Sequence, residues 1–144
     1  LQLYWLRERA ALVDLIGRAE AAGYQAIVLT VDTPQVGRRL RDMRNSFAVH
    51  PSIRAVNLDV TLTAQAHRRL PGQSAIAAHA AQTFDASLTW ADLDWLRGVT
   101  RLPILLKGIL TGEDAGAGED GEFARGRIFA GERHGTAAAA MRPR

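Results

Sequence analysis

Residues 27–39 read Ile-Val-Leu-Thr-Val-Asp-Thr-Pro-Gln-Val-Gly-Arg-Arg, which we interpret as one buried strand and its exit loop. The apolar run from Ile27 to Val31 is nearly unbroken, which is typical of a strand covered on both faces of a parallel sheet. Polar side chains begin where this run ends, and Pro34 prevents the strand ladder from continuing. In parallel α/β folds, functional groups gather at the carboxyl ends of the strands. The polar residues at this end of the strand are Thr30, Asp32 and Thr33.

The residues before this strand predict a helix between two strands. Residues 1–5 form a short apolar run that indicates a strand, and residues 7–22 have the three- and four-residue spacing of a helix with one buried stripe. The apolar positions of this helix are Leu12, Val13, Leu15, Ile16, Ala19 and Ala22. Gly23 is placed to end the helix, and the strand over residues 25–31 follows at once. This order predicts a right-handed βαβ unit.

A second helix is predicted after a long connection. Residues 34–83 contain only short helical patches, and we interpret them as a partly ordered excursion of the kind that often carries binding segments. Thr89 followed three residues later by Asp92 is a capping pair at the start of a helix. The helix is expected to run to about Arg97 and to end at Gly98.

The face of this helix and the strand after it can also be predicted. Leu93 and Leu96 are expected to be buried together with one or both tryptophans of the helix. The apolar residues 103–106 predict another buried strand, which closes on Lys107 and Gly108. A lysine at the end of an apolar strand is unusual enough to favour a functional role over a structural one.

The composition limits the class of protein and the kind of site. The chain has 144 residues and no cysteine, which excludes disulfides and thiolate metal sites. Nothing argues for an oxidising compartment, so we expect a cytoplasmic protein. No apolar run approaches the roughly 18 residues of a membrane span, so we expect no membrane partner. The net charge of +3 and the pI of 10.2 raise a nucleic-acid hypothesis. The arginines are scattered among acidic residues, so we expect no nucleic-acid partner.

The character of the sequence changes after residue 115. Thr111 and Asp114 form another capping pair, but no helical pattern follows, and the sequence becomes rich in Gly, Ala and Arg. We predict two regions: residues 1–115 belong to an α/β domain, and residues 116–144 form a poorly ordered tail. The run Ile128-Phe129-Ala130 within the tail is too short and isolated to predict a strong strand.

Several short sequence motifs occur in the same order as in one enzyme family. They are Leu-Gln-Leu-Tyr from residue 1, Ala-Gly-Tyr-Gln-Ala-Ile-Val-Leu-Thr-Val-Asp-Thr-Pro-x-x-Gly-Arg-Arg from residue 22, x-Asp-x-Arg-Asn-x-Phe from residue 41, Leu-Thr-Trp-x-Asp-Leu-x-Trp-Leu-Arg from residue 88 and Leu-Pro-Ile-Leu-Leu-Lys-Gly-Ile-Leu-Thr from residue 102. Over residues 1–115 the chain thereby resembles the FMN-dependent α-hydroxy acid oxidases and dehydrogenases, which include glycolate oxidase, lactate oxidase and mandelate dehydrogenase. The N-terminal words are most similar to bacterial mandelate or 4-hydroxymandelate oxidases.

The resemblance implies a fold, a cofactor and a reaction. The fold is an FMN-binding (β/α)8 TIM barrel of roughly 250 residues, of which this chain would carry about the third to fifth strands. The family oxidises a 2-hydroxy acid to a 2-oxo acid and passes two electrons to FMN. The implied substrate is a small 2-hydroxy acid, with an aromatic one such as mandelate favoured. The parent family is expected to be homo-oligomeric.

The resemblance assigns three residues to the edge of the flavin and the substrate. Gln2 matches a glutamine that hydrogen-bonds the polar edge of the flavin ring, since an amide both donates and accepts. Tyr4 matches a tyrosine whose hydroxyl faces the substrate, and without the family it would read as an ordinary tyrosine at the end of a strand. Thr30 matches a flavin-contacting threonine, whereas alone it would indicate only the β-propensity of threonine.

Three charged residues are assigned in the same way. Asp32 matches the aspartate that orients the catalytic histidine, although a turn residue is the alternative. Arg39 matches an active-site arginine near the substrate carboxylate, and Arg38 beside it is interpreted as structural. Lys107 matches the lysine whose charge stabilises the reduced, anionic flavin.

The histidine that the family uses as its base is missing from its expected setting. It lies in a Ser-Asn-His-Gly-Gly-Arg-Gln word, which the 144 residues do not contain. His134 is the nearest imitation but lacks the flanking residues, and His50, His67 and His79 read as solvated polar residues. No group has the spacing of metal ligands. We expect a fragment, altered after Ala115, that is inactive by itself; the alternative is a non-catalytic piece that docks to an intact homologue.

Overall fold

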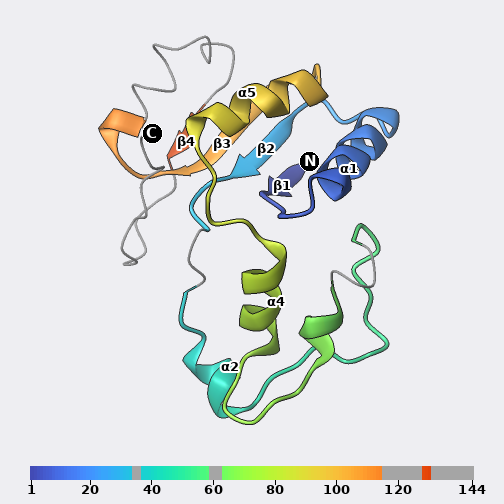
Figure 1. The fold of residues 1–144 in the computed structure, drawn as a ribbon, viewed down its shortest axis with the longest axis vertical. Helices are drawn as coiled ribbons and strands as arrows, with labels where there is room; N and C mark the ends of the chain where they lie inside the picture. Colours follow the sequence, from blue (N-terminus) through green and yellow to red (C-terminus); the bar gives the residue numbers. More distant parts are fainter. Residues whose placement is uncertain (34–36, 59–62, 115–127, 131–144) are drawn as a thin grey trace. The chain divides into compact units, whose positions relative to one another are not determined.

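The computed structural model describes residues 1–33, 37–58, 63–114 and 128–130. The chain divides into two compact units, one of residues Leu1–Gln35 and Ala86–Arg144 and the other of residues Val36–Asp85. The first unit contains the sheet, and the second contains only short helices among its described residues (Figure 1). No helix in the described part of the chain combines the length and the apolar character that crossing a bilayer requires.

A four-stranded parallel sheet organises the first unit. Its strands follow one another in chain order: β1 (Gln2–Tyr4), β2 (Ile27–Thr30), β3 (Ile104–Ile109) and β4 (Ile128–Ala130). The parallel pairing and the intervening helices confirm the predicted α/β class. The sequence predicts the first three strands but not β4, because three apolar residues are too few to give a periodic signal. The predicted tail otherwise lies outside the described residues.

The side chains on the two faces of the sheet differ in how deeply they are buried. Leu3, Leu29 and Leu106 occupy one register row and are 1%, 0% and 5% exposed. Residues in one row of a parallel sheet point to the same face, so this face carries the core. On the other face, Val28 and Leu105 are only half-buried. Thr30 of β2 lies on this second face and is 2% exposed, so the expectation that β2 is buried on both faces is met at Thr30 and only partly met at Val28.

Helix α1 (Arg9–Ala21) connects β1 to β2 and buries a narrow stripe of Leu12, Ile16 and Ala19. Gly23 follows it with a φ of 78°. The Gly23 amide donates to the Glu20 carbonyl, and the Tyr24 amide donates to the Ala19 carbonyl. These two bonds form a Schellman motif, in which a glycine readily takes the left-handed conformation, so the predicted role of Gly23 is confirmed.

Two of the predicted core positions of α1 are wrong. Val13 is 46% exposed, and Ala22 is exposed as well. Val13 lies roughly 100° around the helix from Leu12, so a helix that packs along a narrow stripe leaves it outside.

Helix α5 (Trp90–Val99) precedes β3 and begins at the predicted capping box. The Asp92 carboxylate accepts from the Thr89 amide at 2.8 Å and from the Thr89 hydroxyl at 2.9 Å. Leu93 and Leu96 are buried, as predicted. The prediction that Gly98 ends the helix is wrong, since the helix continues to Val99. A glycine ends a helix when it takes a positive φ, and Gly98 does not.

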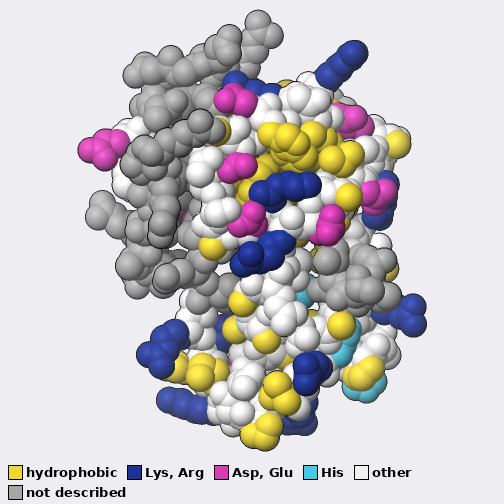
Figure 2. All heavy atoms as spheres, in the orientation of Figure 1, with side chains coloured by type: hydrophobic (Ala, Val, Ile, Leu, Met, Phe, Trp, Pro, Cys, Tyr) yellow, Lys and Arg dark blue, Asp and Glu magenta, His cyan; other side chains and the backbone are white. Residues whose placement is uncertain are grey.

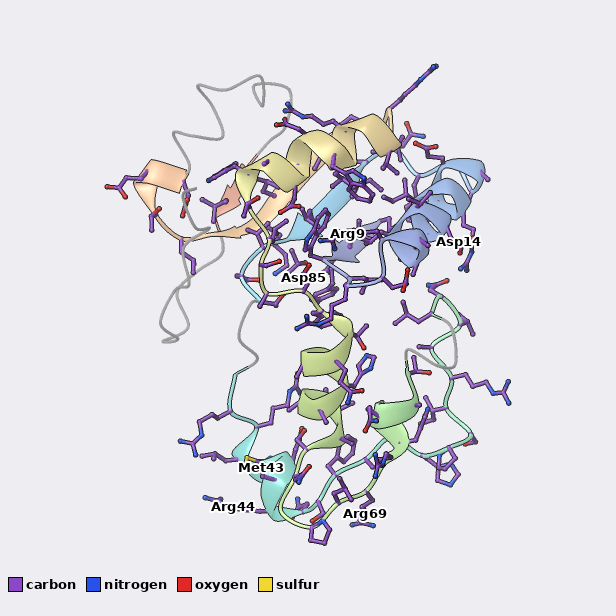
Figure 3. The ribbon with its side chains drawn as sticks, in the orientation of Figure 1. Arg9, Asp14, Met43, Arg44, Arg69 and Asp85 are labelled. Carbon is purple, nitrogen blue, oxygen red and sulfur yellow. The ribbon has the colours of Figure 1, made fainter. Side chains whose placement is uncertain are left out.

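An aromatic cluster joins the residue that follows β1 to helices α1 and α5. The indoles of Trp5 and Trp95 meet edge to face with centroids 5.6 Å apart. Arg9 lies in the unit that contains the sheet (Figure 3). Its guanidinium lies over the Trp5 ring at 4.1 Å and donates to the Leu6 carbonyl. This cation–π contact fixes the first turn of α1 against the residues that leave β1.

The second unit contains α2 (Leu40–Arg44), a 3-10 helix, η1 (Ala64–His67), and α4 (Ala75–Thr83). The Ser74 hydroxyl caps α4 by accepting from the Ala77 amide at 3.3 Å. These short elements agree with the short helical patches that the sequence predicts for residues 34–83. On the face drawn in Figure 2, basic and acidic side chains are interspersed over the unit that contains the sheet.

Candidate active site

Polar side chains lie at or near the carboxyl ends of three neighbouring strands of the sheet: Tyr4 and Thr30 end β1 and β2, and Lys107 lies two residues before the end of β3. Tyr4, Thr30 and Lys107 are partners in one register row of β1, β2 and β3. They therefore lie on one face, which is also the incompletely covered face that carries Val28 and Leu105. Two hydroxyls and an ammonium group are thus brought together at the carboxyl ends of parallel strands, where α/β proteins bind their ligands.

Gln2 connects two members of this row. Its amide Nε2 donates to the Thr30 hydroxyl at 3.0 Å and to the Tyr4 hydroxyl at 3.3 Å. Thr30 is 2% exposed, whereas Gln2 is exposed. The buried hydroxyl therefore anchors an accessible amide. Such an amide offers both a donor and an acceptor to a flat, polar ligand edge.

Lys107 and Asp32 form an ion pair beside this row. Lys107 Nζ lies 3.6 Å from Asp32 Oδ1, and the two side chains are 37% and 32% exposed. A backbone hydrogen bond joins the two segments at the same place, since the Val31 amide donates to the Lys107 carbonyl at 2.9 Å. A partly solvated pair at this distance contributes little to stability but places two opposite charges at one edge of the sheet.

Gly108 is a residue of this site that the sequence analysis missed. Its φ is 102°, and a Cβ built on it would lie 2.8 Å from Asp32 Oδ2 and closer still to Asp32 Cβ and Cγ. The signal was present, because an isolated glycine within a strand pattern indicates a bulge or a close approach of two chain segments.

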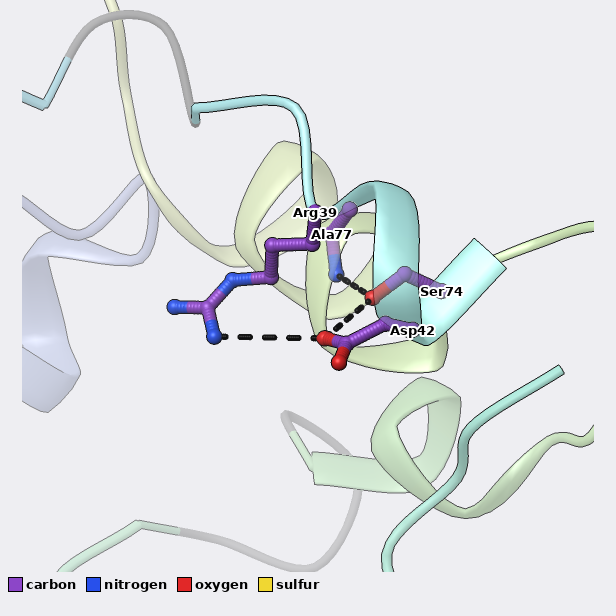
Figure 4. A network of polar contacts seen from close by, with 4 residues as sticks. All are labelled: Arg39, Asp42, Ser74 and Ala77. Carbon is purple, nitrogen blue, oxygen red and sulfur yellow. Dashed lines mark hydrogen bonds and ion pairs between the residues drawn. The ribbon is translucent and has the colours of Figure 1, made fainter. Parts of the chain in front are cut away.

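Arg39 belongs to the second unit and immediately precedes α2. Its Nη1 lies 3.9 Å from Asp42 Oδ2, with the Arg39 side chain 53% exposed (Figure 4). The Ser74 hydroxyl donates to the same carboxylate oxygen at 3.3 Å. Arg38 is exposed. The structure thus places Arg39 in a network of its own unit, and its contact with a substrate stays a prediction.

The three described histidines are not simply solvated. His50 is exposed, with Nδ1 2.7 Å from the Ser52 hydroxyl. His67 and His79 are half-buried, and their Nδ1 atoms lie 3.1 Å from the Val49 carbonyl and 3.2 Å from the Thr83 hydroxyl. The prediction of solvated side chains is therefore wrong for these two, which stabilise the second unit. His134 lies outside the described residues.

No group of three His, Cys, Asp or Glu side chains in the described part of the chain is arranged to bind a metal ion. The charged groups of the site are the Asp32 carboxylate and the Lys107 ammonium. Both suit an organic ligand with a polar edge and a charge.

Comparison with known proteins gives this arrangement a context. The family model described as FMN-dependent dehydrogenase matches residues 1–120. The chain is 53% identical over 114 residues to 4-hydroxymandelate oxidase of Amycolatopsis orientalis, an alignment that covers 79% of this chain and 31% of the relative. It is 44% identical over 116 residues to human 2-hydroxyacid oxidase 1, covering 80% of this chain and 31% of the relative.

A solved structure agrees with these matches. The crystal structure of mandelate oxidase with (S)-4-hydroxymandelic acid is similar with a TM-score of 0.79 and 48% identity, covering 88% of this chain and 34% of that chain. The chain thus spans about a third of the length of the relatives that it matches.

Proposed function

This chain belongs to the FMN-dependent dehydrogenase family, and we propose that it carries part of the site at which an FMN-dependent enzyme oxidises a 2-hydroxy acid to a 2-oxo acid. FMN, when bound, accepts the two electrons of this oxidation. The 4-hydroxymandelate oxidase and mandelate oxidase among the relatives support an aromatic 2-hydroxy acid as the substrate. The strands β1, β2 and β3 would be the third to fifth strands of a (β/α)8 barrel.

The observation that carries this proposal is the row of Tyr4, Thr30 and Lys107 with the Gln2 amide bonded across it. The ring system of FMN has one edge on which hydrogen-bond donors and acceptors alternate. Gln2 and Thr30 would hold this edge, because an exposed amide anchored by a buried hydroxyl can donate and accept without reorganising. The donor set of the row therefore fits the cofactor.

Lys107 and Asp32 would each act on one partner, the flavin and the histidine base. The Lys107 ammonium would stabilise negative charge on the ligand edge, since its side chain is 37% exposed and reaches beyond the strand. The Asp32 carboxylate would accept from the imidazole N–H of the histidine base and fix its tautomer. That histidine would come from a segment unlike any in these 144 residues. The Tyr4 hydroxyl would face the substrate.

Arg39 would bind the substrate carboxylate. Its guanidinium presents a planar fork of donors that matches a carboxylate. The contact with Asp42 is long, at 3.9 Å, and half-exposed, so it is weak enough to be exchanged for a substrate. The proposal predicts that Arg39 acts in binding more than in the chemical step.

The chain by itself is proposed to be inactive, because the histidine word is absent from it. The test is to incubate the purified chain with FMN and with mandelate, lactate or glycolate and to measure hydrogen peroxide and the 2-oxo acid. No product above the level of FMN alone is expected. Turnover by the chain would overturn the proposal that the base lies elsewhere.

A second candidate is a non-catalytic piece that docks to an intact homologue. The observation that favours it is the edge of β1, which among the described strands pairs only with β2. An open strand edge is a template for pairing with another chain. Co-purification with a full-length flavoprotein would support docking; a chain that elutes alone would contradict it.

A further inference from the structure

Gly108 is the point at which β3 departs from regular geometry. Lys107 pairs with Phe129 and Ile109 pairs with Ala130, so Gly108 is an extra residue of β3 relative to β4. Its φ of 102° lies in a region that residues with a side chain rarely adopt. Bulges of this kind re-aim neighbouring side chains and are frequent beside functional sites.

The space that a side chain of Gly108 would fill is taken by Asp32. The nearest atoms to a Cβ on Gly108 are Cγ, Cβ and Oδ2 of Asp32, the last at 2.8 Å. The contact includes Asp32 Cβ, whose position the backbone fixes, as well as the carboxyl atoms Cγ and Oδ2. The carboxylate can therefore lie against β3 only because residue 108 is a glycine.

This contact determines where the charge of Asp32 lies. With its side chain packed on Gly108, Asp32 Oδ1 comes within 3.6 Å of Lys107 Nζ. Lys107 is the only lysine among the 144 residues. The single lysine ammonium is thus held by the Asp32 carboxylate, whose position depends on Gly108, the residue next to Lys107 in the sequence.

We propose that Gly108 is a positioning residue that sets the spacing between the Asp32 carboxylate and the Lys107 ammonium at the ends of β2 and β3. The roles of these two charges toward a histidine and a flavin rest on the proposed function, whereas the spacing itself does not. Any side chain at residue 108 displaces Asp32 and releases Lys107 from it.

The test uses zero-length cross-linking of the full chain with a water-soluble carbodiimide. The reagent activates a carboxylate, the lysine amine attacks the activated carbonyl, and a urea leaves, so an amide forms only between groups already in contact. Because the chain has one lysine, every lysine cross-link identified by mass spectrometry involves Lys107. The wild-type chain is expected to give the Asp32–Lys107 amide, and mixing ¹⁴N- and ¹⁵N-labelled chains confirms that it is intramolecular.

The variant Gly108→Ala is expected to lower the yield of this amide to roughly a tenth or less of the wild-type yield. Gly17→Ala and Gly98→Ala are matched controls, because a Cβ at either glycine meets no atom within 4 Å. Both controls should keep the wild-type yield. An equal yield in Gly108→Ala, or coupling of Lys107 mainly to another carboxylate in the wild type, would overturn the proposal.

A second measurement covers the case in which Gly108→Ala unfolds the chain. The variant Asp32→Gly removes the atoms that a methyl group on residue 108 would meet. Gly108→Ala should therefore lower the Tm less in the Asp32→Gly background than in the wild type, and equal losses would contradict the contact. Neither measurement needs a flavin, so a chain that fails to support FMN binding leaves both results intact, and the failure of the proposed function is recognised separately.

Discussion

A hydrogen bond of 3.0 Å between Gln2 and Thr30 crosses the proposed flavin edge. Thr30→Val keeps the shape of the side chain but removes the acceptor, so it is expected to lower the free energy of unfolding by about 1 kcal/mol. Gln2→Ala should cost less, because the exposed amide is already partly hydrated. The two changes should be coupled by about 0.5–1 kcal/mol in a double-mutant cycle measured by urea denaturation.

The exposed Gln25 provides the control for this cycle. Its Nε2 donates to the Gly23 carbonyl at 3.0 Å, away from Thr30. Gln25→Ala combined with Thr30→Val should be additive. Additivity of Gln2→Ala with Thr30→Val would contradict the hydrogen bond on which the proposed edge depends.

At the residue scale, the sequence located most of the site through a resemblance. Alone, Gln2, Tyr4 and Thr30 are ordinary residues at strand ends, and only register brings them together. Lys107 was distinguishable because a charge at the end of an apolar run is uncommon. Gly108 was missed because its φ and its contact with Asp32 arise from pairing between segments far apart in the chain.

At the scale of the element, a glycine-to-alanine change is expected to have opposite effects on stability at the ends of α1 and α5. Gly98→Ala should stabilise the protein by about 0.5–1 kcal/mol, because Gly98 lies inside α5 where alanine is the better helix former. Gly23→Ala should destabilise it by about 1 kcal/mol, because Gly23 has a positive φ in its Schellman motif. The midpoint of thermal or urea unfolding measures the change in stability of both variants. Destabilisation by Gly98→Ala would mean that α5 ends at Gly98, as the sequence predicts.

The capping box of α5 gives a second element-scale prediction. Thr89→Ala removes the N-cap side chain and is expected to cost about 1 kcal/mol of stability. Asp94→Ala is the matched control, because Asp94 forms an exposed contact with Arg97 at 4.0 Å and should change stability by less than about 0.5 kcal/mol. Equal losses in urea denaturation would mean that Thr89 does not cap the helix.

The sequence predicted elements well where the signal was local. The capping pair Thr89–Asp92 and the C′ glycine Gly23 depend on residues a few positions apart, and both are confirmed. The strand β4 and the exposure of Val13 depend instead on which partner an element packs against. A pattern within one segment carries no information about that partner.

At the scale of the whole molecule, the matched region spans about a third of its relatives, so its competence is best measured inside a complete enzyme. The direct experiment replaces the matching 114 residues of the Amycolatopsis orientalis 4-hydroxymandelate oxidase with those of this chain, which are 53% identical. A parallel chimera carries Lys107→Met. Flavin content and the oxidation of 4-hydroxymandelate are measured in both.

The account predicts that the first chimera retains bound FMN and oxidises 4-hydroxymandelate, and that Lys107→Met lowers kcat by roughly 100-fold, in the range of losing one preorganised electrostatic contact. A soluble, folded chimera that contains no flavin, or one whose activity is unchanged by Lys107→Met, would contradict the assignment of the row of Tyr4, Thr30 and Lys107 to the flavin edge.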